Sequence, residues 1–341
     1  MAGHEETFAL GRFRLPSGPS FAGVVLGDVV VRLGALTAPR VGRAGVHDIE
    51  GLFADWDGHV ARLRERVASL RDAGMEGVPP DTVHELTALN VLAPVRPAQV
   101  FQSGANYRAH VIDLIMAQQI ETRAAETEAE RRARAAAIMD ERAAAGTPYV
   151  FVGLPSAICG PYDDVVLPAD GVQHDWELEL AAVIGRPARH VHRDEALSYV
   201  AGYTIANDIT TRDRVFRPDI PGIGTDWLAS KNAPTFLPTG PFLVPAVFVE
   251  DAMKLQVTLR LNGETMQDAS TADMIFDVAR LIEHTSAKAE LRPGDLLLTG
   301  SPAGNGAHYG RFLRPGDVMT ANITALGEQR NPCVAEEEAP G

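Results

Sequence analysis

Short strand-like stretches fill the second half of the chain and limit its fold more than any other feature. From Tyr149 onward, β-branched and aliphatic runs alternate with Gly and Pro, among them YVFVG, DVVLP, WELELAAVIG, YTIANDIT, FLVP, KLQVTLRLNG, DLLLTG and DVMTANI. Such runs are typical of strands, and only short helical stretches, near 195–199 and 272–284, lie between them. A doubly wound parallel sheet needs a long helix after most strands, so we predict an α+β, β-rich fold.

The first part of the chain, residues 1–92, is predicted to form a small N-terminal α+β domain. FALGRFRL and FAGVVLGDVVVRL indicate strands, with a hairpin turn at Gly27–Asp28, and apolar residues recur at helical spacing over 49–73. No pattern in this part points to chemistry. The main domain is expected to span 93–330, and the acidic end, 331–341, is expected to be a disordered tail.

A long helical insert is predicted at about 114–146. Residues 106–145 contain neither Gly nor Pro, the middle (AAETEAERRARAAA) consists of strong helix formers, and Gly146 followed by Pro148 is a stop signal. The large apolar residues lie at the ends and the centre has almost none, so one long helix or a helical hairpin that projects from the body, with a largely solvated centre, is expected. The simplest interpretation is a solvated charged face, and a lid or a dimer arm is the alternative.

The net charge and the cysteine count indicate which partners and which cellular compartment to expect. The formal net charge is −14, and so acidic a chain is a poor ligand for nucleic acid or an anionic membrane. Its two cysteines cannot form a framework of disulfides, which fits a reducing cytosol. The N-terminus lacks the features of a signal peptide, and no apolar run approaches the roughly 18 residues of a membrane span. We therefore expect a cytoplasmic protein that binds neither nucleic acid nor membrane.

The run HDWELELAAVIG, residues 174–185, carries two carboxylates on one face of a predicted strand. Glu177 and Glu179 share that face, and both faces are otherwise largely apolar, which indicates a strand covered on both sides. Two adjacent buried carboxylates repel each other and lose hydration, and a proton or a cation relieves that cost. Oxygen ligands suit Mg²⁺ first, with Mn²⁺ or Ca²⁺ as alternatives. The competing interpretation is an edge strand whose glutamates face water.

A third carboxylate ends the next predicted strand, in AGYTIANDITTRD. Asp208 lies at the strand terminus just before a polar turn, where a side chain can be directed into a pocket. Asp213 is a weaker candidate because Arg212 and Arg214 flank it and can neutralise it. On its own, NDIT is more typical of a helix cap than of a metal ligand.

A histidine and a carboxylate share a helical face in QSGANYRAHVIDL. His110 and Asp113 are three residues apart, so their side chains can meet. A carboxylate partner fixes the tautomer of a histidine and raises its basicity, which suits a general base near neutral pH. An exposed helix pair without a function is the common alternative.

Together, these segments resemble the fumarylacetoacetate hydrolase (FAH) superfamily. The matching motifs, in the order of that family, are GANYRAH, LPSAICGPYDDVVLP, DWELELAAVIGR, NDITTRD, ASKNAPTFLPTGPFLV and LRPGDLLLTGSPAGNG. They cover about 102–327, apart from the helical insert. The resemblance implies a mixed β-sandwich roll, a divalent metal held by three carboxylates, a small oxo-acid substrate and a homodimer.

The resemblance also implies a role for individual residues. Glu177, Glu179 and Asp208 would hold the metal, and His110 would activate water, with Asp113 standing where the family usually has glutamate. The substrate would be bound by Tyr107, Arg212, Lys231, Thr299, Gly300 and Ser301, with Lys231 also taking part in catalysis.

The expected function is a Mg²⁺-dependent hydrolase that cleaves a C–C bond of a small β-diketo acid through a metal-stabilised enolate. An oxaloacetate-type decarboxylase, or a keto–enol isomerase or hydratase, on the same scaffold is the alternative, because each forms an enolate. A protein of another class, which keeps the metal only as a structural staple, remains a third possibility.

Three departures from the family pattern bear on the substrate more than on the metal. Asp113 is one methylene shorter than glutamate, and Gly153 stands where the family commonly has a lysine. The helical insert is also much longer than the expected loop, so it can reshape access to the site.

Overall fold

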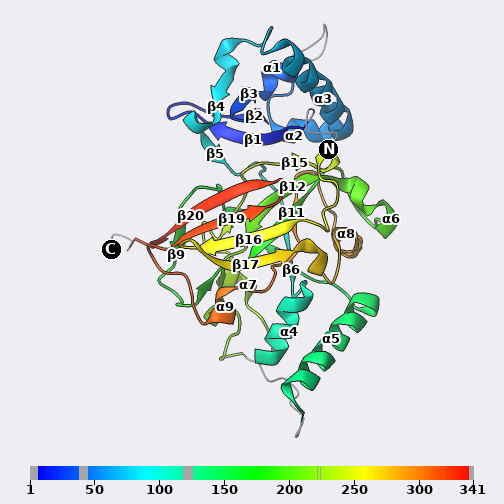
Figure 1. Cartoon of the computed structure of the whole chain (residues 1–341), viewed down its shortest axis with the longest axis vertical. Coiled ribbons are helices and arrows are strands. Elements are labelled where there is room, and N and C mark those ends of the chain that lie inside the picture. The colour runs from blue at the N-terminus through cyan, green and yellow to red at the C-terminus, as the bar shows by residue number, and fades with distance from the viewer. Residues whose placement is uncertain (1–6, 38–44, 118–125, 221, 223, 338–341) are drawn as a thin grey trace.

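A computed structural model of the chain describes residues 7–37, 45–117, 126–220, 222 and 224–337. Its main body is a sandwich of two β-sheets, seen in the middle of Figure 1. One sheet contains, in spatial order, β15 (Val244–Pro245), β12 (Val200–Asn207), β11 (Leu178–Ile184), β18 (Leu296–Leu298), β6 (Val100–Gly104) and β7 (Tyr149–Gly153). The other contains β17 (Glu264–Ser270), β16 (Gln256–Leu261), β19 (Val318–Ile323), β20 (Gly327–Ala335) and β9 (Val165–Leu167).

Both sheets are mixed. Most neighbouring strands run antiparallel, whereas β18 pairs in parallel with β6 and β20 pairs in parallel with β9. Smaller elements complete the body: β8 (Ile158–Cys159) with β14 (Leu237–Pro238), β10 (His174–Asp175) with β13 (Thr210–Thr211), and the helices α6 (Arg193–Ala196), α7 (Trp227–Lys231), α8 (Val278–Ser286) and α9 (Gly306–Tyr309). The predicted β-rich α+β class and the mixed β-sandwich are confirmed.

Strand β11 is buried on both faces, as its apolar pattern predicts. Leu178, Leu180 and the other even-numbered residues face the core between the two large sheets. Ala181 and Val183 belong to a second core, on the outer face of the sheet. A strand in this position has no solvated side, so any charged side chain on it is forced into a buried environment.

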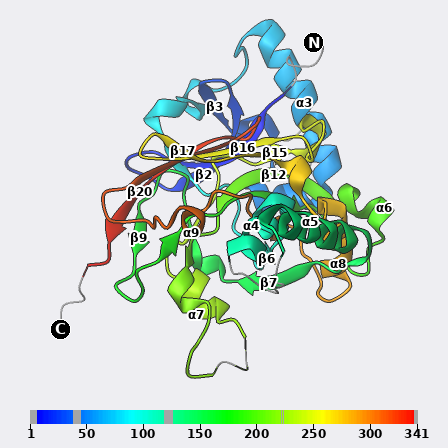
Figure 2. The same cartoon turned by 60° about the horizontal axis from the view of Figure 1, so that its bottom comes forward.

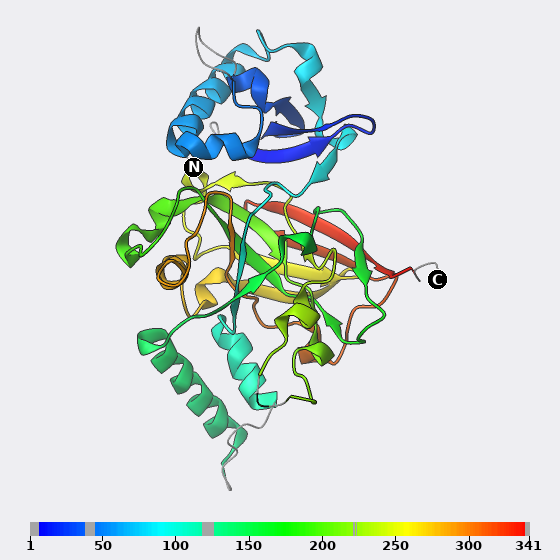
Figure 3. The same ribbon diagram turned by 180° about the vertical axis from the view of Figure 1, so that it is seen from behind.

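The N-terminal unit covers that outer face (Figure 3). Its sheet contains, in order, β4 (Val83–Glu85), β3 (Val29–Arg32), β2 (Ser20–Leu26), β1 (Ala9–Arg14) and β5 (Asn90–Leu92). Its helices are α1 (Leu33–Thr37), α2 (Ile49–Leu52) and α3 (Trp56–Ala73). The predicted hairpin is confirmed: Leu26 pairs with Val29 across a two-residue turn, in which Gly27 takes a φ of +63°. Leu10 of β1 also exchanges two backbone hydrogen bonds with Leu243, so the unit is joined to the main body.

Two helices form the predicted insert, α4 (Arg108–Ala117) and α5 (Glu128–Ala145). They lie side by side at the end of the molecule opposite the N-terminal unit (Figure 1), the end that faces the viewer in Figure 2. A capping box between Thr127 and Glu130 starts α5. Val111 of α4 packs with Met139 of α5, and Ala135 is also buried there. The expectation of a largely solvated centre is confirmed for α5, in which only Ala135 and Met139 are buried; the part of the insert at 118–125 lies outside the described residues.

The predicted tail, 331–341, is wrong at its beginning. Residues up to Ala335 continue β20, which pairs with β19 on one side and β9 on the other. Alternate side chains of this strand, such as Asn331 and Cys333, are buried against the body, and the Asn331 amide donates to the carbonyl of Asp163 over 2.8 Å. The sequence prediction missed this strand because some of its buried residues, such as Asn331, are polar and because acidic residues follow it. Residues 338–341 lie outside the described residues.

Within the described part of the chain, no helix combines the length and the apolar character that crossing a membrane requires.

Candidate metal centre and active site

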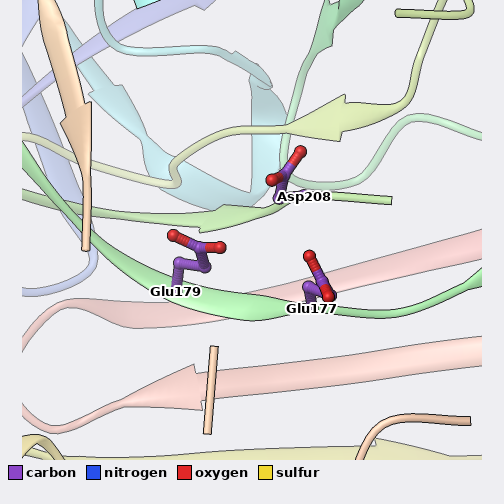
Figure 4. Close-up of side chains that lie close together, drawn as sticks. All are labelled: Glu177, Glu179 and Asp208. Carbon is purple, nitrogen blue, oxygen red and sulfur yellow. The ribbon is translucent and has the colours of Figure 1, made fainter. Parts of the chain in front are cut away.

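Three carboxylates converge where β11 and β12 lie next to each other (Figure 4). Glu179 is on β11, Glu177 immediately precedes that strand, and Asp208 immediately follows β12. The register pairs Leu178 with Asn207, and the backbone N–H of Asp208 donates to the carbonyl of Glu177 over 2.9 Å. Antiparallel pairing therefore brings the end of one strand beside the start of the other, with all three side chains in one place.

The three carboxylates are buried and close enough to share a cation. Each offers an oxygen within 4.8 Å of those of the other two. The exposed fractions are 9% for Glu177, 1% for Glu179 and 1% for Asp208. The alternative of an edge strand with solvated glutamates is therefore wrong, since β11 has a neighbouring strand on each side and its residues are buried.

A glycine turn holds Glu179 in place. The backbone N–H of Gly300 donates to Glu179 Oε2 over 2.6 Å. Gly300 has a φ of +90°, and a Cβ there would lie 2.9 Å from the Cβ of Asn106. Asn106 in turn donates to the carbonyl of Thr299 over 2.7 Å, so glycine is required at this position both for its conformation and for its small size.

Two cations contact the same cluster. Lys231 Nζ donates to Glu177 Oε2 over 2.7 Å and to Asp208 Oδ2 over 2.5 Å. Arg212 donates to Glu177 Oε1 over 2.5 Å and to Asp175 Oδ2 over 2.8 Å. Lys231 is 4% exposed, because α7 places it beneath the cavity at its last turn.

The negative charge of the cluster exceeds its positive charge. Among the described residues that form it, four carboxylates face two cations: Asp175, Glu177, Glu179 and Asp208 against Arg212 and Lys231. Two negative charges remain unbalanced when all these groups are ionised, which is the charge that a divalent cation neutralises. The donor set and its charge therefore fit Mg²⁺ or a similar hard ion.

The pKa values of the carboxylates reflect this imbalance. Burial, followed by the charges of Asp208 and Glu177, raises the pKa of Glu179 well above its usual value. Burial also raises the pKa of Asp208, to about 6, against the opposing effect of Lys231. Burial alone would raise the pKa of Glu177 too, but Arg212 and Lys231 outweigh it and hold that pKa below its usual value.

His110 is buried beside the cluster, whereas Asp113 turns away from it. Burial lowers the pKa of His110 to about 4, partly offset by the negative charge of Glu177. Asp113 contacts Arg132 of α5 at 3.2 Å and His308 at 3.9 Å. No hydrogen bond joins His110 and Asp113 in the described structure, so the predicted His–carboxylate pair is wrong as a direct contact. The α5 insert, which supplies Arg132, draws the carboxylate outward.

A cavity of about 440 Å³ opens above the carboxylates. The predicted site residues that line it are His110, Glu177, Glu179, Asp208, Arg212, Lys231 and Ser301. A smaller cavity of about 50 Å³ adjoins it and is lined by both His110 and Asp113. The chain therefore has room for a small organic acid directly above the candidate metal ligands.

Three residues that the resemblance assigned to substrate binding do not line this cavity. Tyr107 is fully buried within the core of the sandwich. The Thr299 hydroxyl donates to the carbonyl of Leu180 over 2.9 Å, and Gly300 holds Glu179. Their observed contacts position the backbone and a carboxylate, and a direct substrate contact is not supported for them.

Sequence reasoning missed several residues of the site. Gln102 of β6 is 2% exposed and donates to Asp208 Oδ1 over 2.6 Å. A Cβ at Gly153 would lie 2.5 Å from Gln102 Oε1, so the departure from lysine at this position leaves the space that the Gln102 side chain fills. Asp175 and Asn305 were also missed; Asp175 precedes Glu177 by two residues, so strand alternation was the signal that could have found it.

A mixed β-sandwich with buried carboxylates beneath a cavity defines the class of this protein: an α+β protein with a candidate divalent-metal site. The family model described as fumarylacetoacetate (FAA) hydrolase C-terminal matches residues 99–334, which is more than half of the chain. The chain belongs to the fumarylacetoacetate hydrolase superfamily.

Its relatives are named for more than one reaction. Over 186 residues, the chain is 43% identical to the 2,4-didehydro-3-deoxy-L-rhamnonate hydrolase of Sphingomonas sp. (strain SKA58), covering 54% of this chain and 64% of that protein. Over 182 residues, it is 40% identical to the human mitochondrial oxaloacetate tautomerase FAHD2B, covering 53% of this chain and 57% of that protein. These matches span less than two thirds of either relative.

A solved structure is similar over almost the whole chain. The fumarylacetoacetate hydrolase of psychrophilic Exiguobacterium antarcticum superimposes with a TM-score of 0.70 at 26% identity, covering 97% of this chain and all of that one. The fold is therefore shared from the N-terminal unit to the end of the sandwich. The homodimer expected from the family resemblance stays a prediction.

Proposed function

We propose that this protein is a Mg²⁺-dependent hydrolase that cleaves a C–C bond of a small β-diketo acid. The observation that carries the proposal is the convergence of Glu177, Glu179 and Asp208 at the floor of a cavity that also contains His110. The family relationship supports an enzyme, since its named relatives include a hydrolase and a tautomerase.

The residues of the floor suit an enolate-forming reaction. Glu177, Glu179 and Asp208 would hold the ion, which when bound would polarise the 2-oxo group of the substrate and stabilise the negative charge of the leaving enolate. Lys231 already uses its three N–H donors on Glu177, Asp208 and Thr210. It therefore orients and partly neutralises the carboxylates, and a direct role on the substrate would require it to release one of them.

His110 would accept a proton from water. Its lowered pKa leaves the ring neutral near pH 7, so a ring nitrogen is free of the extra proton. The adjoining cavity of about 50 Å³, between His110 and Asp113, has room for a water molecule. Ser301 lines the cavity; its Oγ accepts a hydrogen bond from Gln267 over 2.9 Å, and its hydroxyl donates to the carbonyl of Pro302 over 3.5 Å. A contact with a substrate oxygen would require the hydroxyl to release that carbonyl.

A keto–enol tautomerase is the second candidate, and the orientation of Asp113 favours it. A tautomerase needs a proton acceptor but no attacking water, and Asp113, which pairs with Arg132, makes no hydrogen bond with His110 in the described structure. The 40% identity to an oxaloacetate tautomerase supports the same alternative. A decarboxylase also uses enolate stabilisation alone. A purely structural metal site is less well supported, because it would need neither the cavity nor His110.

Parallel assays on the full chain separate these functions. Acetylpyruvate, fumarylpyruvate and oxaloacetate are incubated with Mg²⁺ or with EDTA, and the release of the cleaved acids, enol–keto conversion and CO₂ release are followed. The proposal expects Mg²⁺-dependent cleavage of a β-diketo acid. Enol–keto conversion without cleavage would show that the protein is a tautomerase and contradict the hydrolase proposal. Release of CO₂ alone would indicate a decarboxylase.

A further inference from the structure

An aromatic wall, formed by Tyr149, Phe151 and Trp227, borders the cavity on one side. The Phe151 and Trp227 rings stack with centroids 4.4 Å apart and planes 14° from parallel. Trp227 Nε1 donates to the Tyr149 hydroxyl over 2.8 Å, so the indole N–H is paired within the wall itself. The wall therefore presents mainly ring carbons to a ligand.

The aromatic residues of this wall come from strand β7 and helix α7. On both elements, the side chains near the carboxylates are small or polar, and those nearer the surface are aromatic. On β7, Gly153, Phe151 and Tyr149 share a face; Gly153 is buried beside Gln102, and Tyr149 is 45% exposed. On α7, Lys231 and Trp227 are four residues apart and share a helical face. Lys231 is at the carboxylates, and Trp227 is one turn farther out and less buried.

Two other segments that line the cavity repeat the same change. On α4, His110 lies beside the carboxylates, and Leu114, four residues later, lines the cavity one turn away. After Arg212 the chain places Val215 and Phe216 on the cavity wall, and Phe216 is 66% exposed. Four segments therefore surround a polar floor with apolar or aromatic side chains.

The cations near the cavity are already engaged at the floor. Among the described residues that line it, the lysine and arginine side chains are those of Lys231 and Arg212, and both are paired with buried carboxylates. A second carboxylate on the far end of a substrate would lie against ring carbons, with no unengaged lysine or arginine among the described lining residues to pair with. Burying an unpaired charge in such surroundings is strongly unfavourable, whereas burying a hydrocarbon group is favourable.

We infer that the preferred substrate is a 2-oxo acid whose end remote from the carboxylate cluster is a hydrocarbon or aryl group, and not a second carboxylate. The inference rests on the proposed function for the reaction at the floor, and adds the class of acyl group. The carboxylate and 2-oxo group would lie at the polar floor, and the apolar end between Phe151, Trp227 and Leu114.

Two stable 2-oxo acids of similar length test the inference by binding alone. Affinities of 2-oxo-4-phenylbutanoate and 2-oxoadipate for the full chain are measured by calorimetry in the presence of Mg²⁺, with oxalate as a ligand that reports only on the floor. We expect the phenyl compound to bind about tenfold or more tightly than the dicarboxylate. Equal affinity, or a preference for 2-oxoadipate, would overturn the inference.

Variants of β7 connect the preference to the aromatic wall. Phe151→Ala should remove most of the preference for the phenyl compound while leaving oxalate affinity unchanged, and Phe151→Leu should retain part of it. Val152→Ala is the matched control, because Val152 is 61% exposed and lies on the opposite face of β7. If a folded Phe151→Ala protein still preferred the phenyl compound as strongly as the unmodified protein does, the aromatic wall would not be the source of the preference, and the inference would be contradicted.

The reaction is tested separately from the binding preference. Cleavage of 2,4-dioxo-4-phenylbutanoate and of acetylpyruvate is measured with the same preparations. A phenyl preference in binding without cleavage of either compound would remove the hydrolase proposal and leave this inference standing. Cleavage of acetylpyruvate without a preference for the phenyl compound in binding would support the hydrolase proposal and contradict this inference.

Discussion

Asp113 of α4 forms an ion pair with Arg132 of α5, with 3.2 Å between Oδ1 and Nη2. The pair joins the helix that carries His110 to the second helix of the insert, and Asp113 also lies 3.9 Å from the ring of His308. The carboxylate expected to orient His110 thus contributes to the packing of the insert. Since Asp113 borders the small cavity beside His110, its charge still acts on that region.

His110→Ala is expected to lower C–C hydrolysis by about 10²-fold or more while the affinity for Mg²⁺ stays unchanged, because the ring accepts the proton but is not a metal ligand. Steady-state rates and calorimetry on the same preparation check both parts. His192→Ala, at an exposed histidine, is the control. Persisting hydrolysis would show that another group is the base.

Asp113→Asn is expected to reduce hydrolysis by less than about tenfold, a much smaller loss than that of His110→Ala. The reason is that Asp113 makes a partly exposed ion pair with Arg132 and no hydrogen bond with His110. Comparison of the turnover numbers of the two variants tests this. Equal losses would mean that the carboxylate and the imidazole act as one unit.

Glu179→Gln is expected to weaken Mg²⁺ binding at least about 100-fold, because the amide keeps the size of the side chain but removes one of three ligand charges. Calorimetric titration with Mg²⁺ or Mn²⁺ measures the change. Glu264→Gln, at an exposed position on β17, should bind as the unmodified protein does. Unchanged affinity in Glu179→Gln would refute the assignment of this residue as a ligand.

Divalent-metal affinity is expected to rise with pH from about 5 through 6 and above. The pKa of Asp208 is raised to about 6 and that of Glu179 is raised well above its usual value, so at low pH the ion must displace protons from both. For each proton released, the association constant should increase about tenfold per pH unit below the pKa of that group. Titrations in buffers with different ionisation enthalpies count the protons, and a pH-independent affinity would contradict the raised pKa values.

Met139→Ala is expected to destabilise the protein by about 2–5 kcal/mol and to lower hydrolysis, with Mg²⁺ affinity unchanged. Met139 is 4% exposed and packs with Val111 and Ile112 of α4, so the cavity left behind would loosen the helix that carries His110. Chemical denaturation and rate measurements test the two effects. Ile138→Ala, at a 39% exposed neighbour, should change stability by about 0.5 kcal/mol or less. Equal effects of both variants on stability and hydrolysis would show that the packing of α5 against α4 does not hold His110 in place.

Local sequence patterns determined the strands and the positions of the candidate ligands. Alternation on β11 places Glu177 and Glu179 on the same face, and the apolar residues between them require that both faces be covered. The end of β12 supplies Asp208. These features depend on the period of a strand and on burial, which a single sequence expresses directly.

Tertiary packing alone decided which groups meet across the site. Lys231 and Gln102 both donate hydrogen bonds to Asp208 from other segments of the chain. The sequence around Lys231 or Gln102 contains no pattern that predicts this contact. The spacing of His110 and Asp113 allowed a contact, but Arg132, on a different helix, determined where that carboxylate lies. Helical spacing fixes which side chains share a face, while competing ion pairs and the available space fix which of them touch.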